Sequence, residues 1–226
     1  MARERWATLA KIALGVGLGA VIVAAGLVPK PVDQGQGGRI LFWHIPAAWV
    51  ATLAFILSSG YSVRYLLRRR PADDYRAVNA ATLGIVFCLL ATASGALFAR
   101  IAWGAFWNWD PRQTTIVFLL LFYAAYLGLR AAIADEERRA TLSAAYNVLA
   151  LVVVPFLVLV APRLATPTLH PDTILNVRGA ATAGLSPLFR AVFLAALAGF
   201  TGLFLWAYAL ANRASRIEQL LAEEDD

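Results

Sequence analysis

Hydrophobic residues are gathered into six long runs, at about residues 6–28, 40–66, 77–99, 114–133, 142–161 and 188–211. Each run is long enough to cross a hydrocarbon core of roughly 30 Å, which takes about 20 apolar residues in an α-helix. The connections between them are short, and those at 29–39 and 162–187 are rich in proline and glycine. The pattern predicts an all-α integral membrane protein, in which residues 1–226 form a single bundle of six transmembrane helices.

The composition supports this class. Hydrophobic residues make up 60% of the chain and charged residues only 15%, whereas about 25% charge is normal for a soluble domain. A net charge of +6 raises the question of nucleic-acid binding. The basic residues lie mostly at the ends of the apolar runs, however, which is typical of topology signals and contacts with lipid headgroups. We therefore expect membrane lipid, and no nucleic acid, as a partner.

The distribution of lysine and arginine predicts the orientation, because these residues are enriched on the cytoplasmic side. With six spans, 13 of the 20 basic residues fall on the side of the two termini and seven on the other. We expect both termini to be cytoplasmic in a bacterial inner membrane. The connections 29–39, 100–113 and 162–187 should then face outward, to the periplasm.

The outward segment 100–113 carries an unusual concentration of aromatic side chains. It contains three of the seven tryptophans, Trp103, Trp107 and Trp109, followed by Asp110. Tryptophans also gather at membrane interfaces as a general belt. A platform for a large, flat, apolar ligand is the alternative that such a dense aromatic segment favours.

The only two histidines fall on the same predicted side as this segment. His44 lies about four residues into the second span, roughly 6 Å below its outer end at about 1.5 Å per residue. His170 is in the last outer loop. Two imidazoles beside an aromatic platform suit heme, whose propionates would meet Arg39, Arg100 or Arg112. Taken singly, each of these residues is also typical of an ordinary interfacial or loop position.

Other classes have less support. The sequence contains no H-E-x-x-H, G-x-S-x-G or Walker-type motif, and no acid/base or nucleophile set that would indicate a conventional enzyme. Cys88 is the sole cysteine, so neither an internal disulfide nor a C-x-x-C-H heme attachment is possible. Ionisable residues are almost absent from the middle of the spans, where ion-coupled transporters usually carry one.

Three segments resemble a known family. The sequence Trp-Gly-Ala-Phe-Trp-Asn-Trp-Asp, from Trp103 to Asp110, resembles the tryptophan-rich WWD signature of heme-handling proteins in cytochrome c maturation. The pattern Arg39-x-x-x-x-His44-x-Pro-Ala resembles the histidine segment at the second span of the CcmC family. Thr-Leu-His170 is similar to the histidine segment in the last outer loop of that family, and six spans also fit it.

The resemblance implies a function and a set of site residues. His44 and His170 would be axial ligands of a non-covalent b-type heme, with Arg39 and Arg112 at its propionates. Phe106 stands where a tryptophan is frequent in the family, and it lacks the indole N–H donor. The heme-binding platform would comprise Trp103, Gly104, Trp107, Trp109 and Asp110.

The resemblance further implies a lyase-like scaffold that binds heme at the outer face and presents it to the heme chaperone CcmE. An ATP-binding-cassette complex of CcmA and CcmB, with the small protein CcmD, would release the loaded chaperone. Three alternatives stay open at this point: a transmembrane heme exporter, a heme b redox subunit that takes electrons from quinol, and a purely structural membrane subunit.

Overall fold

Long helices make up almost all of the structure, a computed structural model that describes residues 2–28, 37–165, 167–170 and 186–225. Six helices within these ranges are long and apolar enough to cross a membrane, which confirms the predicted all-α bundle of six spans. Most of the predicted connections 29–39 and 162–187 lies outside the described residues. The spans run over Thr8–Leu27, Gly37–Arg68, Pro71–Trp103, Pro111–Ala132, Glu136–Leu164 and Pro187–Glu224.

Several helices extend beyond the apolar runs. The first four and the last are α1 (Ala2–Leu27), α2 (Leu41–Arg68), α3 (Pro71–Trp103), α4 (Pro111–Ala132) and α8 (Pro187–Asp225). The fifth span is broken into α5 (Glu136–Val148), α6 (Ala150–Pro155), the π-helix η2 (Phe156–Val160) and α7 (Ala161–Leu164). The π-helix begins directly after Pro155, where the missing proline N–H interrupts the α-helical hydrogen-bond ladder.

Local sequence explains where α2 ends and α3 begins. Arg69 closes α2 in the left-handed conformation, with φ 53°, and its N–H donates to the Tyr65 carbonyl at 2.7 Å. Arg70 is extended, as expected for a residue before proline, and Pro71 starts α3 with the φ that a helix requires. This tight turn holds α2 and α3 side by side along their length.

The main core lies between α2, α3, α4, α6 and α8 and is filled by aromatic rings and small residues. The rings of Phe55 and Tyr123 are fully buried and stack with centroids 3.7 Å apart. Gly84 of α3 faces Phe55, and a Cβ atom at Gly84 would lie 2.5 Å from that ring. The absent side chain therefore lets α2 and α3 approach closely, as small residues do between membrane helices.

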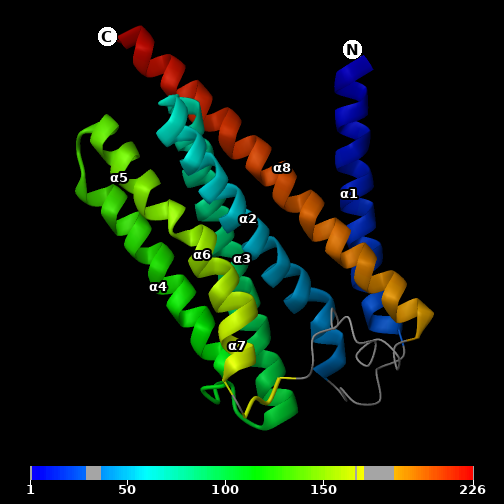
Figure 1. Cartoon of the computed structure of the whole chain (residues 1–226). Coiled ribbons are helices and arrows are strands. Elements are labelled where there is room, and N and C mark those ends of the chain that lie inside the picture. Colours follow the sequence, from blue (N-terminus) through cyan, green and yellow to red (C-terminus); the bar gives the residue numbers. More distant parts are fainter. Residues whose placement is uncertain (1, 29–36, 166, 171–185, 226) are drawn as a thin grey trace.

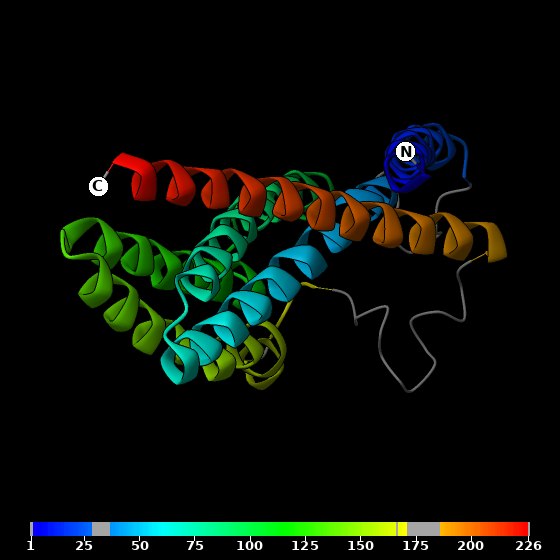
Figure 2. The same ribbon diagram turned by 90° about the horizontal axis from the view of Figure 1, so that it is seen from above.

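The two ends of the bundle differ in what they carry. Figure 1 shows the first and last described residues at one end, and the α3–α4 connection together with the segment after α7 at the other. Seen from above, α1 lies at the edge of the bundle beside α8 (Figure 2), where Leu18 packs onto Gly199. The end opposite the termini thus brings the tryptophan segment next to the segment that carries His170.

Candidate functional site

The connection from α3 to α4, residues 104–110, is called the tryptophan loop below. It begins at Gly104, whose φ of 85° and N–H bond to the Arg100 carbonyl end α3 in the left-handed conformation that glycine favours. Trp109 is also left-handed, with φ 54°. Such a backbone costs a non-glycine residue on the order of 1 kcal/mol and often marks a functional site. It leaves the Trp109 side chain 73% exposed.

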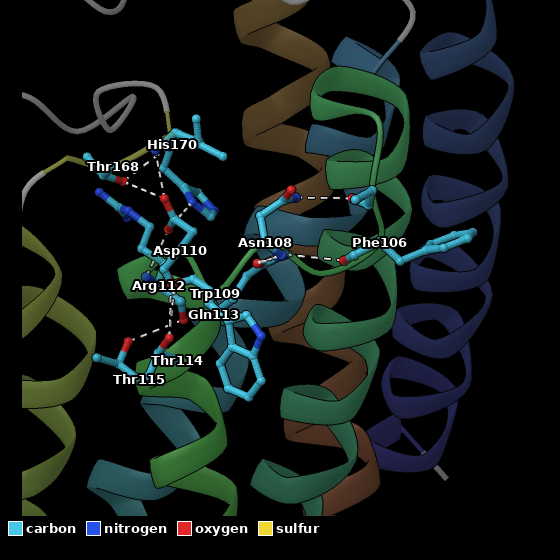
Figure 3. A network of polar contacts seen from close by, with 12 residues as sticks. Phe106, Asn108, Trp109, Asp110, Arg112, Gln113, Thr114, Thr115, Thr168 and His170 are labelled. Atoms are coloured by element: carbon cyan, nitrogen blue, oxygen red, sulfur yellow. Dashed lines mark hydrogen bonds and ion pairs between the residues drawn. The ribbon is translucent and has the colours of Figure 1, made fainter.

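The loop is held by hydrogen bonds to the first turns of α4 (Figure 3). The Asn108 N–H donates to the Gln113 side-chain oxygen at 2.8 Å, and the Gln113 amide donates back to the Phe106 carbonyl at 3.3 Å. The Trp107 and Trp109 rings meet edge to face, with centroids 5.8 Å apart. The loop therefore presents two indoles in a defined arrangement.

Asp110 joins this loop to the segment that carries His170. It is the N-cap of α4, accepting from the Arg112 N–H at 2.9 Å. Its other oxygen accepts from the Thr168 hydroxyl at 2.8 Å and from the Leu169 N–H at 2.7 Å. The His170 Nδ1 lies 2.7 Å from the same oxygen that caps α4. We call Asp110 and residues 168–170 the Asp110 clamp, because one carboxylate holds both segments (Figure 3).

The charge states within the clamp follow from its surroundings. Burial alone raises the pKa of the Asp110 carboxyl, but the hydrogen bonds from its neighbours outweigh this effect and hold the pKa below its ordinary value. Burial lowers the pKa of the His170 imidazole, and the Asp110 carboxylate offsets only part of that effect. A neutral imidazole beside an ionised carboxylate must donate through Nδ1–H, which leaves the lone pair on Nε2.

His44, in the second span, is held in a comparable way. It is the fourth residue of α2, and its Nδ1 lies 2.9 Å from the Ala91 carbonyl oxygen of α3 and 3.3 Å from the Ser94 hydroxyl. A carbonyl only accepts, so Nδ1 carries the proton and Nε2 the lone pair. His170 and Arg112 are close enough to interact electrostatically with this ring.

Among the other residues expected from the sequence, Trp103 contacts His170, with centroids 4.9 Å apart at 66°. Phe98 packs against Trp103 in turn. Arg112 lies in the first turn of α4 beside the clamp, whereas Arg39 is the exposed residue of the short helical turn before α2. The Arg100 guanidinium bonds the Gly104 carbonyl and lies over the Phe106 ring, so it stabilises the loop.

Sequence reasoning missed three residues that support the histidines. Thr168 binds the Asp110 carboxylate, and Ser94 and Gly95 border the His44 ring. The signal for the last two is a run of small residues at 91–96 within α3, since small residues in a membrane helix mark the close approach of a neighbour.

The fold and this end of the bundle define a helical, multi-pass membrane protein with an aromatic and histidine-bearing surface. The family model "CcmC: Heme exporter protein C" matches residues 1–224. The chain belongs to this CcmC family.

Relatives agree with that assignment. The chain is 32% identical over 205 residues to "Heme exporter protein C" of Paracoccus denitrificans, covering 88% of this chain and 83% of that protein. It is 32% identical over 116 residues to a "Putative cytochrome c biosynthesis ccmC-like mitochondrial protein" of Marchantia polymorpha, covering 51% of each. A shorter match is with "Cytochrome c biogenesis protein CcsA" of Prochlorococcus marinus. It is 39% identical over 80 residues, covering 35% of this chain and 25% of that protein.

Proposed function

We propose that the protein binds heme at the outer, periplasmic face of the inner membrane and presents it to the heme chaperone CcmE during cytochrome c maturation. His44 and His170 are the axial ligands in this proposal. The family and the names of its relatives support a role in heme handling. The distribution of basic residues supports the orientation, with both termini in the cytoplasm.

The observation that carries the proposal is the state of the two imidazoles. Each donates its Nδ1–H to an oxygen, the Ala91 carbonyl or the Asp110 carboxylate, at 2.9 and 2.7 Å. Each therefore offers the Nε2 lone pair to a metal, the arrangement in which metal-binding histidines are usually held. Two imidazoles complete the coordination of a heme iron, whose other four ligands are the porphyrin nitrogens.

The surrounding groups fit the rest of a porphyrin. Trp103 stacks edge-on against His170, and Trp107 with Trp109 supplies a further aromatic surface. Arg112 is close enough to both histidines to interact with them electrostatically, and Arg39 is exposed on the short turn before α2. We assign these two arginines to the heme propionates, because a guanidinium binds carboxylates through paired hydrogen bonds. Heme itself would supply the chemistry of attachment to the chaperone, and the protein would orient its edge.

The exposed position of the aromatic groups supports the presentation of heme to a partner rather than its storage. Trp109 and Phe106 are exposed at the end of the bundle, so a soluble domain can approach the ligand from outside the membrane. Release of the loaded chaperone is assigned to the CcmA/CcmB ATP-binding-cassette complex with CcmD. This division of labour agrees with the lack of a Walker-type motif in the chain.

A transfer experiment tests the function. The purified full-length protein should carry non-covalent heme b, extractable into acidified organic solvent, and should load it onto the purified soluble domain of CcmE. The membrane protein without heme, mixed with the same domain, is the control. Heme that is rapidly reduced by quinol but never reaches the chaperone would overturn the proposal in favour of a redox subunit. A protein that purifies without heme and takes none up would overturn heme handling altogether.

A further inference from the structure

The His44 imidazole lies directly on a glycine of the neighbouring helix. A Cβ atom built on Gly95 of α3 would be 2.7 Å from Cε1, 3.1 Å from Nδ1 and 3.6 Å from Nε2 of the ring. Real Cβ atoms do not approach other atoms at the shortest of these distances. The ring therefore occupies the space that any other residue at position 95 would fill. Gly60 and Gly128, in α2 and α4, have nothing within 4 Å of such an atom.

The ring cannot readily move away from this position. Its Nδ1–H is directed at the Ala91 carbonyl, with the Ser94 hydroxyl as a second acceptor at 3.3 Å. The same Ala91 carbonyl is the one that the Gly95 N–H bonds in a regular α-helix, four residues on. The oxygen that orients the ring and the glycine beneath it thus belong to one turn of α3. We call Ala91, Ser94 and Gly95 the His44 seat.

A glycine inside a helix has an energetic cost. It lowers helix stability by about 0.5–1 kcal/mol relative to alanine, because its unfolded chain is more flexible. At Gly95 the gain is that the Nδ1 and Cε1 atoms of the His44 ring can lie close to the backbone of α3. With the ring in this position, its bond to the Ala91 carbonyl makes Nδ1 the protonated nitrogen and sets the direction of the Nε2 lone pair.

We infer that Gly95 is a positioning residue for the His44 ligand: by leaving room for the ring against α3, it sets the direction from which Nε2 meets the heme iron. This inference rests on the proposed heme binding at His44. A side chain at position 95 would push the ring off the Ala91 carbonyl and swing Nε2 away from the axial direction. Metal affinity depends on such supporting contacts, whose loss typically costs 10- to 100-fold.

The test compares four variants of the full-length protein in detergent by heme titration and absorption spectroscopy. Gly95→Ala should weaken heme binding by on the order of 10- to 100-fold and convert low-spin heme into a high-spin mixture. Gly128→Ala, the matched control, should behave as wild type. His44→Ala should lose the low-spin signal, and Gly95→Ala added to His44→Ala should change nothing further, because the ring that position 95 meets is gone.

The outcomes separate this inference from the proposed function. Wild-type affinity and spectrum in Gly95→Ala, alongside loss in His44→Ala, would overturn the role of Gly95 and leave heme binding standing. A wild-type protein without histidine-ligated heme would overturn both. If Gly95→Ala alone fails to accumulate, the double variant should restore accumulation by removing the clash. Failure of the double variant to accumulate as well would overturn the inference.

Discussion

The two histidines are supported by different parts of the molecule in different ways. His44 lies within α2 and donates to an uncharged backbone carbonyl of α3. His170 lies in the non-helical segment after α7 and donates to the Asp110 carboxylate. A carboxylate makes the imidazole more electron-rich and so a stronger ligand than a carbonyl does. If both rings bind heme as proposed, the His44 seat would fix the direction of one ligand and the Asp110 clamp would strengthen the other.

The comparison also shows how each support depends on the sequence. In the His44 seat, the acceptor is the Ala91 backbone carbonyl and the space for the ring is left by Gly95. Because the acceptor belongs to the backbone, most substitutions nearby leave it in place. The Asp110 clamp depends on one carboxylate that accepts four hydrogen bonds from four residues, Arg112, Thr168, Leu169 and His170. In the proposed function, His44 is thus a ligand held within a span, and His170 is a ligand whose position depends on the Asp110 side chain. Such a pair suits a heme that is held and then handed over.

Removal of both ligands has the largest expected effect. His44→Ala combined with His170→Ala should abolish bound heme and its spectrum, because no imidazole remains for the iron. Each single variant should keep residual heme with one axial histidine. Absorption spectra of protein purified in equal amounts measure this. Full heme occupancy with an unchanged spectrum in the double variant would show that the ligands are elsewhere.

Asp110→Ala should have the next largest effect, with heme affinity lower by on the order of 10- to 100-fold, since the clamp that orients His170 is lost. Asp135→Ala is the matched control: Asp135 caps α5 through the Arg138 N–H at 2.7 Å and touches neither histidine. Each variant loses a helix cap, at a cost of about 1 kcal/mol. Equal loss of heme in the two variants, measured by titration, would contradict the clamp.

The tryptophan loop should affect transfer more than accumulation. Trp107→Ala together with Trp109→Ala should weaken loading of the heme chaperone while the amount of membrane protein stays near wild type. The pair Trp6→Ala and Trp206→Ala, two exposed tryptophans outside the loop, serves as the control. Chaperone loading and immunoblots of the same membranes separate the two effects, and equal loss of both would indicate a folding role.

Ser94→Ala should have the smallest effect. Its hydroxyl is the more distant acceptor for the His44 Nδ1–H, at 3.3 Å against 2.9 Å for the Ala91 carbonyl. Loss of one such bond is worth about 0.5–1 kcal/mol, so heme affinity should fall by less than about tenfold. A loss as large as that of Gly95→Ala would mean that the hydroxyl, rather than the carbonyl and the glycine, orients the ring.

The spans could be predicted from the sequence because each is a run of about 20 apolar residues, the length that a bilayer requires. The residues at which the helices end could not be predicted in this way. α8 continues to Asp225 through a polar stretch rich in alanine, leucine and glutamate, residues that favour a helix without being uniformly apolar. Hydropathy reports the membrane-spanning part of a helix, and helix propensity governs how far it continues beyond the bilayer.

Part of the candidate site could also be predicted from the sequence. The tryptophans, Asp110 and the two histidines stand out because their residue types occur in a recognisable pattern. The contact between His170 and Asp110 joins positions 60 residues apart, and no local periodicity reports it. Gly95 is important because it has no side chain, which leaves room for the His44 ring. This role can be inferred only from the position of the neighbouring helix α2. The sequence pattern proposes the two histidine ligands, and the packing of α2 on α3 shows which residues hold the His44 ring in place.

Near-infrared magnetic circular dichroism of the ferric, heme-loaded protein tests most directly whether both imidazoles bind one iron, because the charge-transfer band of low-spin heme depends on its pair of axial ligands. The account predicts a bis-imidazole band in the wild-type protein that disappears in both His44→Ala and His170→Ala. A high-spin spectrum in the wild type, or a bis-imidazole band that survives either single substitution, would contradict it.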